Sequence, residues 1–96
     1  MAYVVAATYR AREGEEEKIL EALEAMAPLS RAEPGCRFYQ AHRSPEDPRV
    51  FFMYEQYVDE AGYQSHMATD HFERYIRGAA IPRLESRERA FYTTLD

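Results

Sequence analysis

The chain has 96 residues and a formal net charge of −5, and 46% of its residues are hydrophobic, 14% aromatic and 30% charged. These values are typical of one folded domain over residues 1–96 and exclude a disordered chain. The chain has no basic run, no apolar run near the roughly 18 residues of a membrane span, and a single cysteine. We therefore expect a soluble cytoplasmic protein without an internal disulfide that binds neither nucleic acid nor membranes.

The first half of the chain predicts a strand, a helix and a hairpin. Residues 3–9 are β-branched and aromatic without charge, which predicts a strand buried on both faces. A helix is expected to begin after Gly14, where acidic residues favour the positive end of the helix dipole, and to end at Pro34-Gly35. Residues 36–42 and 50–58 then predict two strands joined by a turn.

The second half predicts two helical segments and a last strand. Asp59 can cap a short helix, and Asp70 with Glu73 forms a capping-box-like pair that starts the next one. Pro82 should end or kink this second helix. Four of its residues share one face: Phe72, Tyr75, Ile76 and Ala79. Residues 87–95 alternate as a fourth strand, so the order β-α-β-β-α-β predicts an α+β ferredoxin-like fold.

A sheet with helices on a single face leaves its other face apolar. The run Phe51-Phe52-Met53 has no polar side to offer water, and thirteen aromatic residues are many for one small domain to bury. Packing this apolar face against the same face of a second copy would bury it from water. The sequence therefore predicts a homodimer, a dimeric α+β barrel.

A small-molecule site is expected between residues 54 and 72. Glu55 lies inside an aromatic strand, and ionisable groups are rarely buried without a partner. His66 and His71 follow it. They are five residues apart, about 140° around a continuous helix, which does not suit a two-histidine metal site, and no third ligand stands out. We interpret them instead as flanking a helix-to-helix junction at Thr69-Asp70, with His66 near a C-terminus and His71 near an N-terminus.

Glu55 has two alternative roles. It can orient an imidazole by fixing its tautomer. It can also pair with an arginine of the last strand, Arg87 or Arg89, across the dimer. The structural pairing is the favoured one, because buried carboxylates usually end up paired.

The aromatic residues near this site also have two possible roles. Tyr54 and Tyr57 point to opposite faces of their strand, so only one of them can face a cavity beneath the helices. Phe72 and Tyr75 either line that cavity or form ordinary helix-to-sheet core.

Four segments together resemble a known family. They are Ala11-Arg12-Glu13-Gly14, residues 30–36 (SRAEPGC), Tyr54-Glu55-Gln56-Tyr57, and residues 66–72 with the pattern His-x-x-Thr-x-His-Phe. In this order they resemble the antibiotic biosynthesis monooxygenase family of small dimeric α+β-barrel proteins, essentially end to end. A haem-degrading branch of that family uses an Asn, a Trp and a His. This chain has neither Asn nor Trp, which excludes that activity.

Two other branches share the spaced histidines. One is similar to quinol monooxygenases, which oxidise hydroquinone-type aromatics with O₂ and use neither metal nor organic cofactor. The other resembles the isomerase of the phosphorylated autoinducer-2 signal. A phosphorylated substrate is expected to bind to cationic side chains. Candidates in the sequence are Arg74, Arg77 and Arg83.

The resemblance to the first branch implies a cofactor-independent monooxygenase that acts on a small quinol or polyphenol. The candidate catalytic residues are His66, His71 and Glu55. The candidate substrate-binding residues are Tyr54, Tyr57, Phe72 and Tyr75. The isomerase and a non-catalytic small-molecule-binding module are the alternatives, since fold alone does not decide function.

Overall fold

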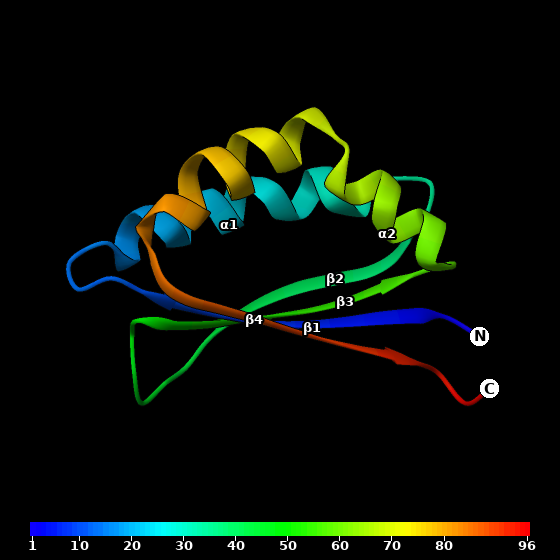
Figure 1. Ribbon diagram of the computed structural model, residues 1–96, viewed down its shortest axis with the longest axis horizontal. Helices are drawn as coiled ribbons and strands as arrows, with labels where there is room; N and C mark the ends of the chain where they lie inside the picture. The colour runs from blue at the N-terminus through cyan, green and yellow to red at the C-terminus, as the bar shows by residue number, and fades with distance from the viewer.

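Four antiparallel strands form one sheet in the order β2-β3-β1-β4 in the computed structural model (Figure 1). The strands are β1 (Tyr3–Ala11), β2 (Cys36–Arg43), β3 (Val50–Tyr57) and β4 (Leu84–Thr93). This order confirms the ferredoxin-like prediction. The last strand begins at Leu84 rather than at residue 87, because the segment before residue 87 already pairs with the end of β1.

All helices lie on one face of the sheet (Figure 1). They are α1 (Glu16–Arg31), α2 (Glu60–Met67), the π-helix η1 (Phe72–Ala80) and the short 3₁₀ helix η2 (Ile81–Arg83). Helix α1 follows Gly14, whose φ of +86° is a conformation that glycine adopts readily. Pro28 lies inside the helix, which already ends at Arg31, before Pro34-Gly35.

The second long helix differs from the predicted α-helix because its main part is a π-helix. The N–H of Ile81 donates to the carbonyl of Ile76, five residues earlier. The wider turn changes the buried set from the predicted one to residues spaced by four: Phe72, Ile76 and Ala80. Tyr75 and Ala79 are only half-buried.

Side chains alternate between the two faces of the sheet, and the helices cover one face only. The covered face carries the core residues of the two central strands: Val5, Ala7, Tyr9, Phe51 and Met53. The other face, called the open face below, carries the exposed side chains of Thr8 and Phe52. The prediction that residues 3–9 are buried on both faces is therefore wrong at Thr8, because nothing in the chain covers that face.

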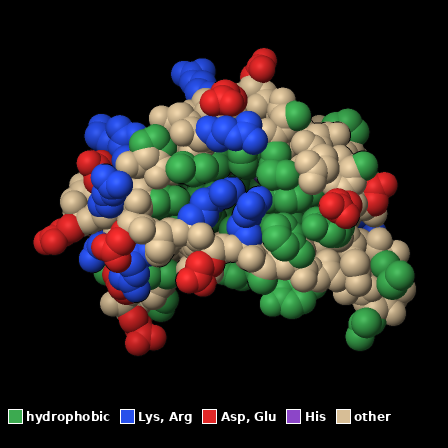
Figure 2. Space-filling model, in the orientation of Figure 1, with side chains coloured by type: hydrophobic (Ala, Val, Ile, Leu, Met, Phe, Trp, Pro, Cys, Tyr) green, Lys and Arg blue, Asp and Glu red, His purple; other side chains and the backbone are tan.

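The helices pack over β2 and β3 and leave the side near β4 less covered. Figure 2 shows that the molecule is hollowed between the helices and β4, with Lys and Arg side chains among hydrophobic ones. No histidine is visible on this face. No helix is long and apolar enough to cross a membrane.

Candidate functional site

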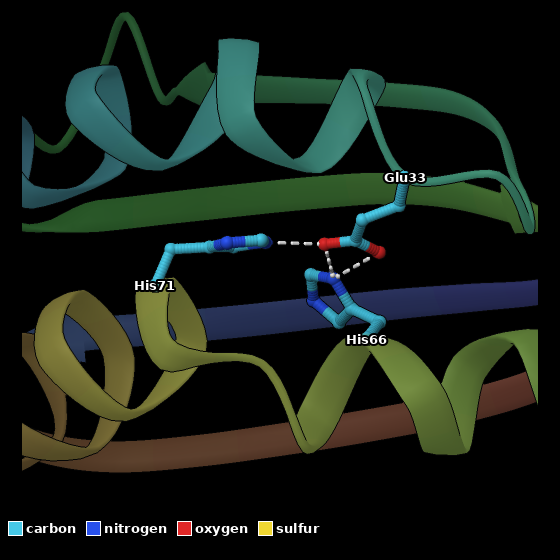
Figure 3. Close-up of side chains that lie close together, drawn as sticks. All are labelled: Glu33, His66 and His71. Atoms are coloured by element: carbon cyan, nitrogen blue, oxygen red, sulfur yellow. Dashed lines mark hydrogen bonds and ion pairs between the residues drawn. The ribbon is translucent and has the colours of Figure 1, made fainter.

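Three acid–base side chains from distant parts of the chain meet between the helices (Figure 3). Glu33 lies in the connection between α1 and β2. Its Oε1 and Oε2 are 3.0 and 2.9 Å from Nδ1 of His66, and its Oε2 is 2.5 Å from Nε2 of His71. The side chain of His66 is 2% exposed, that of Glu33 10% and that of His71 19%. We call these three residues the Glu–His–His triad; it is buried at His66 and accessible at His71.

A break in the helix at Thr69 allows the two histidines to converge. The Thr69 hydroxyl donates to the carbonyl of His66 at 2.8 Å and accepts from the N–H of Phe72 at 3.1 Å. The predicted junction is therefore present, but the N-cap is Thr69 and not Asp70. A five-residue spacing puts two side chains on different faces of a continuous helix, but here the helix is interrupted between His66 and His71.

A close contact of two glycines places Glu33 beside α2. A Cβ atom built on Gly35 would lie 3.0 Å from the Cα of Gly62, and one on Gly62 would lie 3.1 Å from the carbonyl oxygen of Gly35. Any side chain here would push apart the turn that carries Glu33 and the helix that carries His66. His66 lies one helical turn after Gly62 and therefore comes within reach of Glu33.

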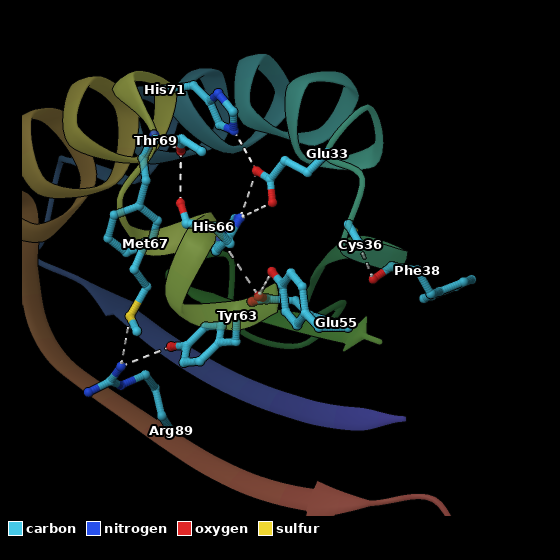
Figure 4. Close-up of polar contacts among 12 residues, drawn as sticks. Glu33, Cys36, Phe38, Glu55, Tyr63, His66, Met67, Thr69, His71 and Arg89 are labelled. Carbon is cyan, nitrogen blue, oxygen red and sulfur yellow. Dashed lines mark hydrogen bonds and ion pairs between the residues drawn. The ribbon is translucent and has the colours of Figure 1, made fainter. Parts of the chain in front are cut away.

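A second carboxylate lies below His66 on the covered face of β3 (Figure 4). Oε1 of Glu55 is 3.9 Å from Nε2 of His66 and accepts a hydrogen bond of 2.6 Å from the hydroxyl of Tyr57. Burial raises the pKa of the Glu55 carboxyl, although the Tyr57 bond and His66 act in the opposite direction. Burial and the neighbouring Glu55 raise the pKa of Tyr57. Tyr57 is therefore a neutral donor that holds Glu55 in place.

Neither predicted arginine pairs with Glu55 within the chain. Nη1 of Arg89 donates to the hydroxyl of Tyr63 at 2.9 Å, and the guanidinium of Arg87 lies 5.7 Å from the ring centroid of Tyr9. Of the two predicted roles of Glu55, orientation of an imidazole is the one that the contacts within the chain support.

Aromatic rings pack directly on His66 and leave no open pocket there. Four ring centroids lie 5.2–6.1 Å from that of His66: those of Tyr39, Tyr57, Tyr63 and Phe72. The structure has two grooves, of about 410 and 390 Å³, and neither is lined by a residue of the triad. Of the predicted aromatic residues, Tyr57 and Phe72 pack on His66 as core, and their rings fill the space around the imidazole.

Two of the predicted substrate-binding residues lie away from the triad. Tyr54 is on the open face of β3, where its hydroxyl accepts a 2.8 Å hydrogen bond from Nε2 of Gln56. Tyr75 lines the smaller groove, between α1 and η1. The alternation of side chains along the strand and the π-helical turn place Tyr54 and Tyr75 apart from the two histidines within the chain.

Glu33 is the central residue that the sequence analysis missed. It stands just past the end of α1, where the negative end of the helix dipole disfavours a carboxylate. An acidic residue at such a position signals a partner that donates hydrogen bonds or carries positive charge, and two imidazoles supply it here. Its Oε atoms and the facing nitrogens of His66 and His71 all lie within 4.8 Å of one another, so the triad could also hold a metal ion.

Comparisons with known proteins agree with the resemblance noted in the sequence. The family described as "Antibiotic biosynthesis monooxygenase" matches residues 2–78. The structure of PA3566 from Pseudomonas aeruginosa is 32% identical with a TM-score of 0.89, and the match covers 99% of this chain and 95% of that one. SO0527 from Shewanella oneidensis is 30% identical with a TM-score of 0.87, over 95% of this chain and 88% of that one.

A candidate antibiotic biosynthesis monooxygenase from Nitrosomonas europaea is 25% identical with a TM-score of 0.92, over 98% of this chain and 90% of that one. A search of curated proteins found no match.

Proposed function

Because the chain belongs to the antibiotic biosynthesis monooxygenase family, we propose that it is a cofactor-independent monooxygenase that oxidises a small quinol or polyphenol with O₂. The observation that carries this proposal is the position of Glu33 between His66 and His71. It creates a chain of acid–base groups from the accessible His71 to the buried Glu55. Such a chain can remove a phenol proton and disperse the resulting charge.

His71 is the base in this proposal. An ionised Glu33 carboxylate only accepts hydrogen bonds, so its contact with Nε2 of His71 assigns the proton of His71 to Nε2. The lone pair of Nδ1 is then free to take the phenol proton. The positive charge that forms on His71 faces Glu33, which stabilises it in a site of low exposure.

His66 and Glu55 support this step from below. His66 donates its Nδ1 proton to Glu33, and its Nε2 faces Oε1 of Glu55 at 3.9 Å. Tyr57 keeps Glu55 oriented. His66 is therefore a positioning residue for Glu33 and, through Glu33, for His71.

The electrons come from the substrate. Once His71 has removed a proton, the electron-rich phenolate transfers one electron to O₂. The resulting substrate radical and superoxide then combine to form a carbon–oxygen bond. His71 returns its proton to the outer peroxide oxygen. The O–O bond then breaks as the hydrogen on the same ring carbon leaves as a proton, which releases water and converts that carbon to a carbonyl. The sum is quinol plus O₂ to hydroxyquinone plus water, so one oxygen atom enters the ring and the other is reduced.

The exposed side of His71 is where the substrate meets the triad in this proposal. His66 is 2% exposed and enclosed by rings, which leaves Nδ1 of His71 as the accessible nitrogen. A small aromatic substrate fits this position better than a large one, since no deep pocket opens there.

The homodimer is part of the same proposal. Three large aromatic side chains are exposed on the open face: Phe38 at 45%, Phe52 at 37% and Tyr92 at 59%. Exposed apolar side chains gathered on one sheet face mark an interaction surface. A second copy with the same face supplies a self-complementary partner.

An isomerase of a phosphorylated substrate is the alternative enzyme, and it would use the same proton relay. The three arginines considered for phosphate binding already have partners. The guanidinium groups of Arg74 and Arg77 lie over the rings of Tyr75 and Phe72, and Arg83 pairs with Glu15. This arrangement favours the monooxygenase, and turnover without O₂ would reverse that preference.

The test is O₂ uptake by chelator-treated protein with a panel of hydroquinones and polyhydroxynaphthalenes. We expect uptake above autoxidation that falls by about 10²-fold or more in His71→Ala and Glu33→Gln. His42→Ala is the matched control, because His42 lies on the open face and contacts the carbonyl of Phe52. Unchanged uptake in both triad variants would refute the relay. An absence of uptake with the whole panel would refute the monooxygenase.

A further inference from the structure

We propose that Glu33, His66 and His71 bind one divalent transition-metal ion. The three facing ligand atoms lie within 4.8 Å of one another. Zinc bonds to His nitrogen and carboxylate oxygen are about 2.1 Å long, so ligands of one ion lie at most about 4.2 Å apart. The Glu33 contacts of 2.9 Å to His66 and 2.5 Å to His71 are hydrogen-bond distances, shorter than the roughly 3.4 Å between two ligands of a tetrahedral ion with bonds of about 2.1 Å. An ion that replaces the two shared protons therefore has to move the three side chains slightly apart.

The surroundings of His66 match those of a metal-bound imidazole. Metal-binding histidines commonly direct their second ring nitrogen at a carboxylate, which fixes the tautomer and orients the ring. Here Nδ1 of His66 faces the triad, while Nε2 faces Oε1 of Glu55 at 3.9 Å. Glu55 is itself held by the hydroxyl of Tyr57. The chain thus contains both the ligands and the group that would hold one of them in place.

The electrostatic surroundings of Glu33 favour a bound cation. No Lys or Arg side chain pairs with Glu33, whose partners are the two imidazoles alone. Glu33 also lies at the negative end of the α1 dipole, which a bound cation would compensate. A divalent ion between Glu33 and two neutral imidazoles leaves a single net positive charge in place of a carboxylate without a fixed counter-charge.

The donor set indicates which ions fit. Two imidazole nitrogens and one carboxylate oxygen suit Zn²⁺, Fe²⁺, Co²⁺ and Ni²⁺, whereas Ca²⁺ and Mg²⁺ prefer sites made of oxygen. Three protein ligands leave at least one position open to water or another small ligand. That position lies toward His71, the most exposed member of the triad.

Metal binding and the proposed proton relay exclude each other. The ion occupies the nitrogen lone pairs of Nδ1 of His66 and Nε2 of His71, and it replaces the protons that these atoms share with Glu33. The metal-bound protein therefore loses the relay, and metal supply becomes a control on the proposed activity. The binding itself needs no substrate, so it stands or falls independently of the proposed function.

The experiment is a titration of the chelator-treated, folded protein with Zn²⁺ by calorimetry and with Co²⁺ by visible absorption. We expect one ion per chain, with Co²⁺ bands that Zn²⁺ abolishes, and no heat with Mg²⁺. Glu33→Gln keeps the shape of the side chain and should weaken Zn²⁺ binding by more than tenfold, as should His71→Ala. His42→Ala should bind as the wild type does, and circular dichroism verifies that each variant is folded.

Glu55→Gln tests the orienting carboxylate and should weaken binding by about tenfold, the lower end for such partners. Binding of Zn²⁺ by Glu33→Gln and His71→Ala at wild-type affinity, or no binding by the folded wild type, would overturn the proposal. O₂ uptake by the chelated protein is measured separately, so failure of the metal site and failure of the oxygenase are distinguishable.

Discussion

Strand β3 presents different kinds of side chain on the two faces of the sheet. On the covered face, β3 presents Glu55 and Tyr57, which bond to each other and face His66. On the open face, the same strand presents Tyr54 and Gln56, which bond to each other and remain half-exposed. A shift of one residue along β3 therefore separates a buried acid–base cluster from the open face, which we propose as the dimer interface. Helix cover, rather than residue type, decides which tyrosine contributes to the site.

The largest expected difference between the faces is in stability, and Phe51 and Phe52 are the matched pair that measures it. Phe51 is 1% exposed in the core and Phe52 is 37% exposed on the open face. Phe51→Ala should lower the free energy of unfolding by about 3–5 kcal/mol, because it leaves a cavity. Phe52→Ala should cost about 1 kcal/mol in dilute protein. Urea unfolding measures both values.

The two substitutions should also differ in how their effects depend on protein concentration. The effect of Phe52→Ala should grow as the concentration rises into the range where the proposed dimer would form, since the lost ring would then also weaken association. The effect of Phe51→Ala should not depend on concentration. Equal costs for both substitutions at every concentration would contradict the assignment of the two faces.

The next largest expected effect is on the formation of the proposed dimer. A carboxylate on the open face should oppose burial of this face against a second copy, so Phe52→Glu should elute as a monomer where the wild type is a dimer. Leu29→Glu is the control: Leu29 is 42% exposed on α1, outside the sheet. Light scattering coupled to size exclusion measures the mass. A monomeric wild type, or a dimeric Phe52→Glu variant, would show that the open face is not the interface.

The covered face should also control the pH dependence of stability through Glu55. Its folded pKa is raised above the ordinary value of 4.5, chiefly by burial. Between that value and the raised pKa, the unfolded chain has lost a proton that the folded chain retains. Stability therefore falls as pH rises through this window, by at most about 1.4 kcal/mol per pH unit. Glu55→Gln should remove this decline.

Chemical unfolding at several pH values, in the presence of a chelator, tests the Glu55 prediction. Glu24→Gln is the control, since Glu24 is exposed on α1 and should leave the decline intact. If the wild type and Glu55→Gln have parallel stability profiles above pH 4.5, the burial of Glu55 does not govern this dependence.

Local sequence patterns account for most of the fold. Hydrophobic alternation, turn residues and caps act within a few residues, so they predict the β-α-β-β-α-β order and the junction between His66 and His71. They do not predict a π-helix, because the choice of a wider turn depends on how η1 packs on α1. The predicted buried face of η1 therefore includes Tyr75, whereas in the structure Tyr75 lines the groove between α1 and η1.

The site was less predictable because its key contacts are non-local. Glu33 is separated from His66 by 33 residues and from His71 by 38. No periodicity links positions so far apart, and the approach depends on the contact of Gly35 with Gly62. Local reasoning found the histidines and the second carboxylate, whereas the residue that joins them required the three-dimensional arrangement.

The smallest expected effect has the opposite sign to that of Glu55 and comes from Asp47, in the turn between β2 and β3. Asp47 accepts a hydrogen bond of 3.0 Å from the N–H of Arg49 and pairs with Nη1 of Arg10 at 2.9 Å. The backbone bond, followed by Arg10, lowers the pKa of this carboxyl below 3.8. Its contribution to stability is therefore present above pH 3.8 and is lost as pH falls through the lowered pKa.

An NMR titration of the Asp47 carboxyl carbon measures this effect directly. Arg10→Ala should raise the pKa of Asp47 only part of the way to 3.8, because the larger cause, the N–H of Arg49, remains. Lys18→Ala, an exposed cation on α1, should leave it unchanged. A pKa that returns fully to 3.8 in Arg10→Ala would mean that the ion pair, and not the turn backbone, holds the charge. A carboxylate in water is thus stabilised as an anion by its local turn, whereas burial under the helices raises the pKa of Glu55, so the two should respond to acid in opposite directions.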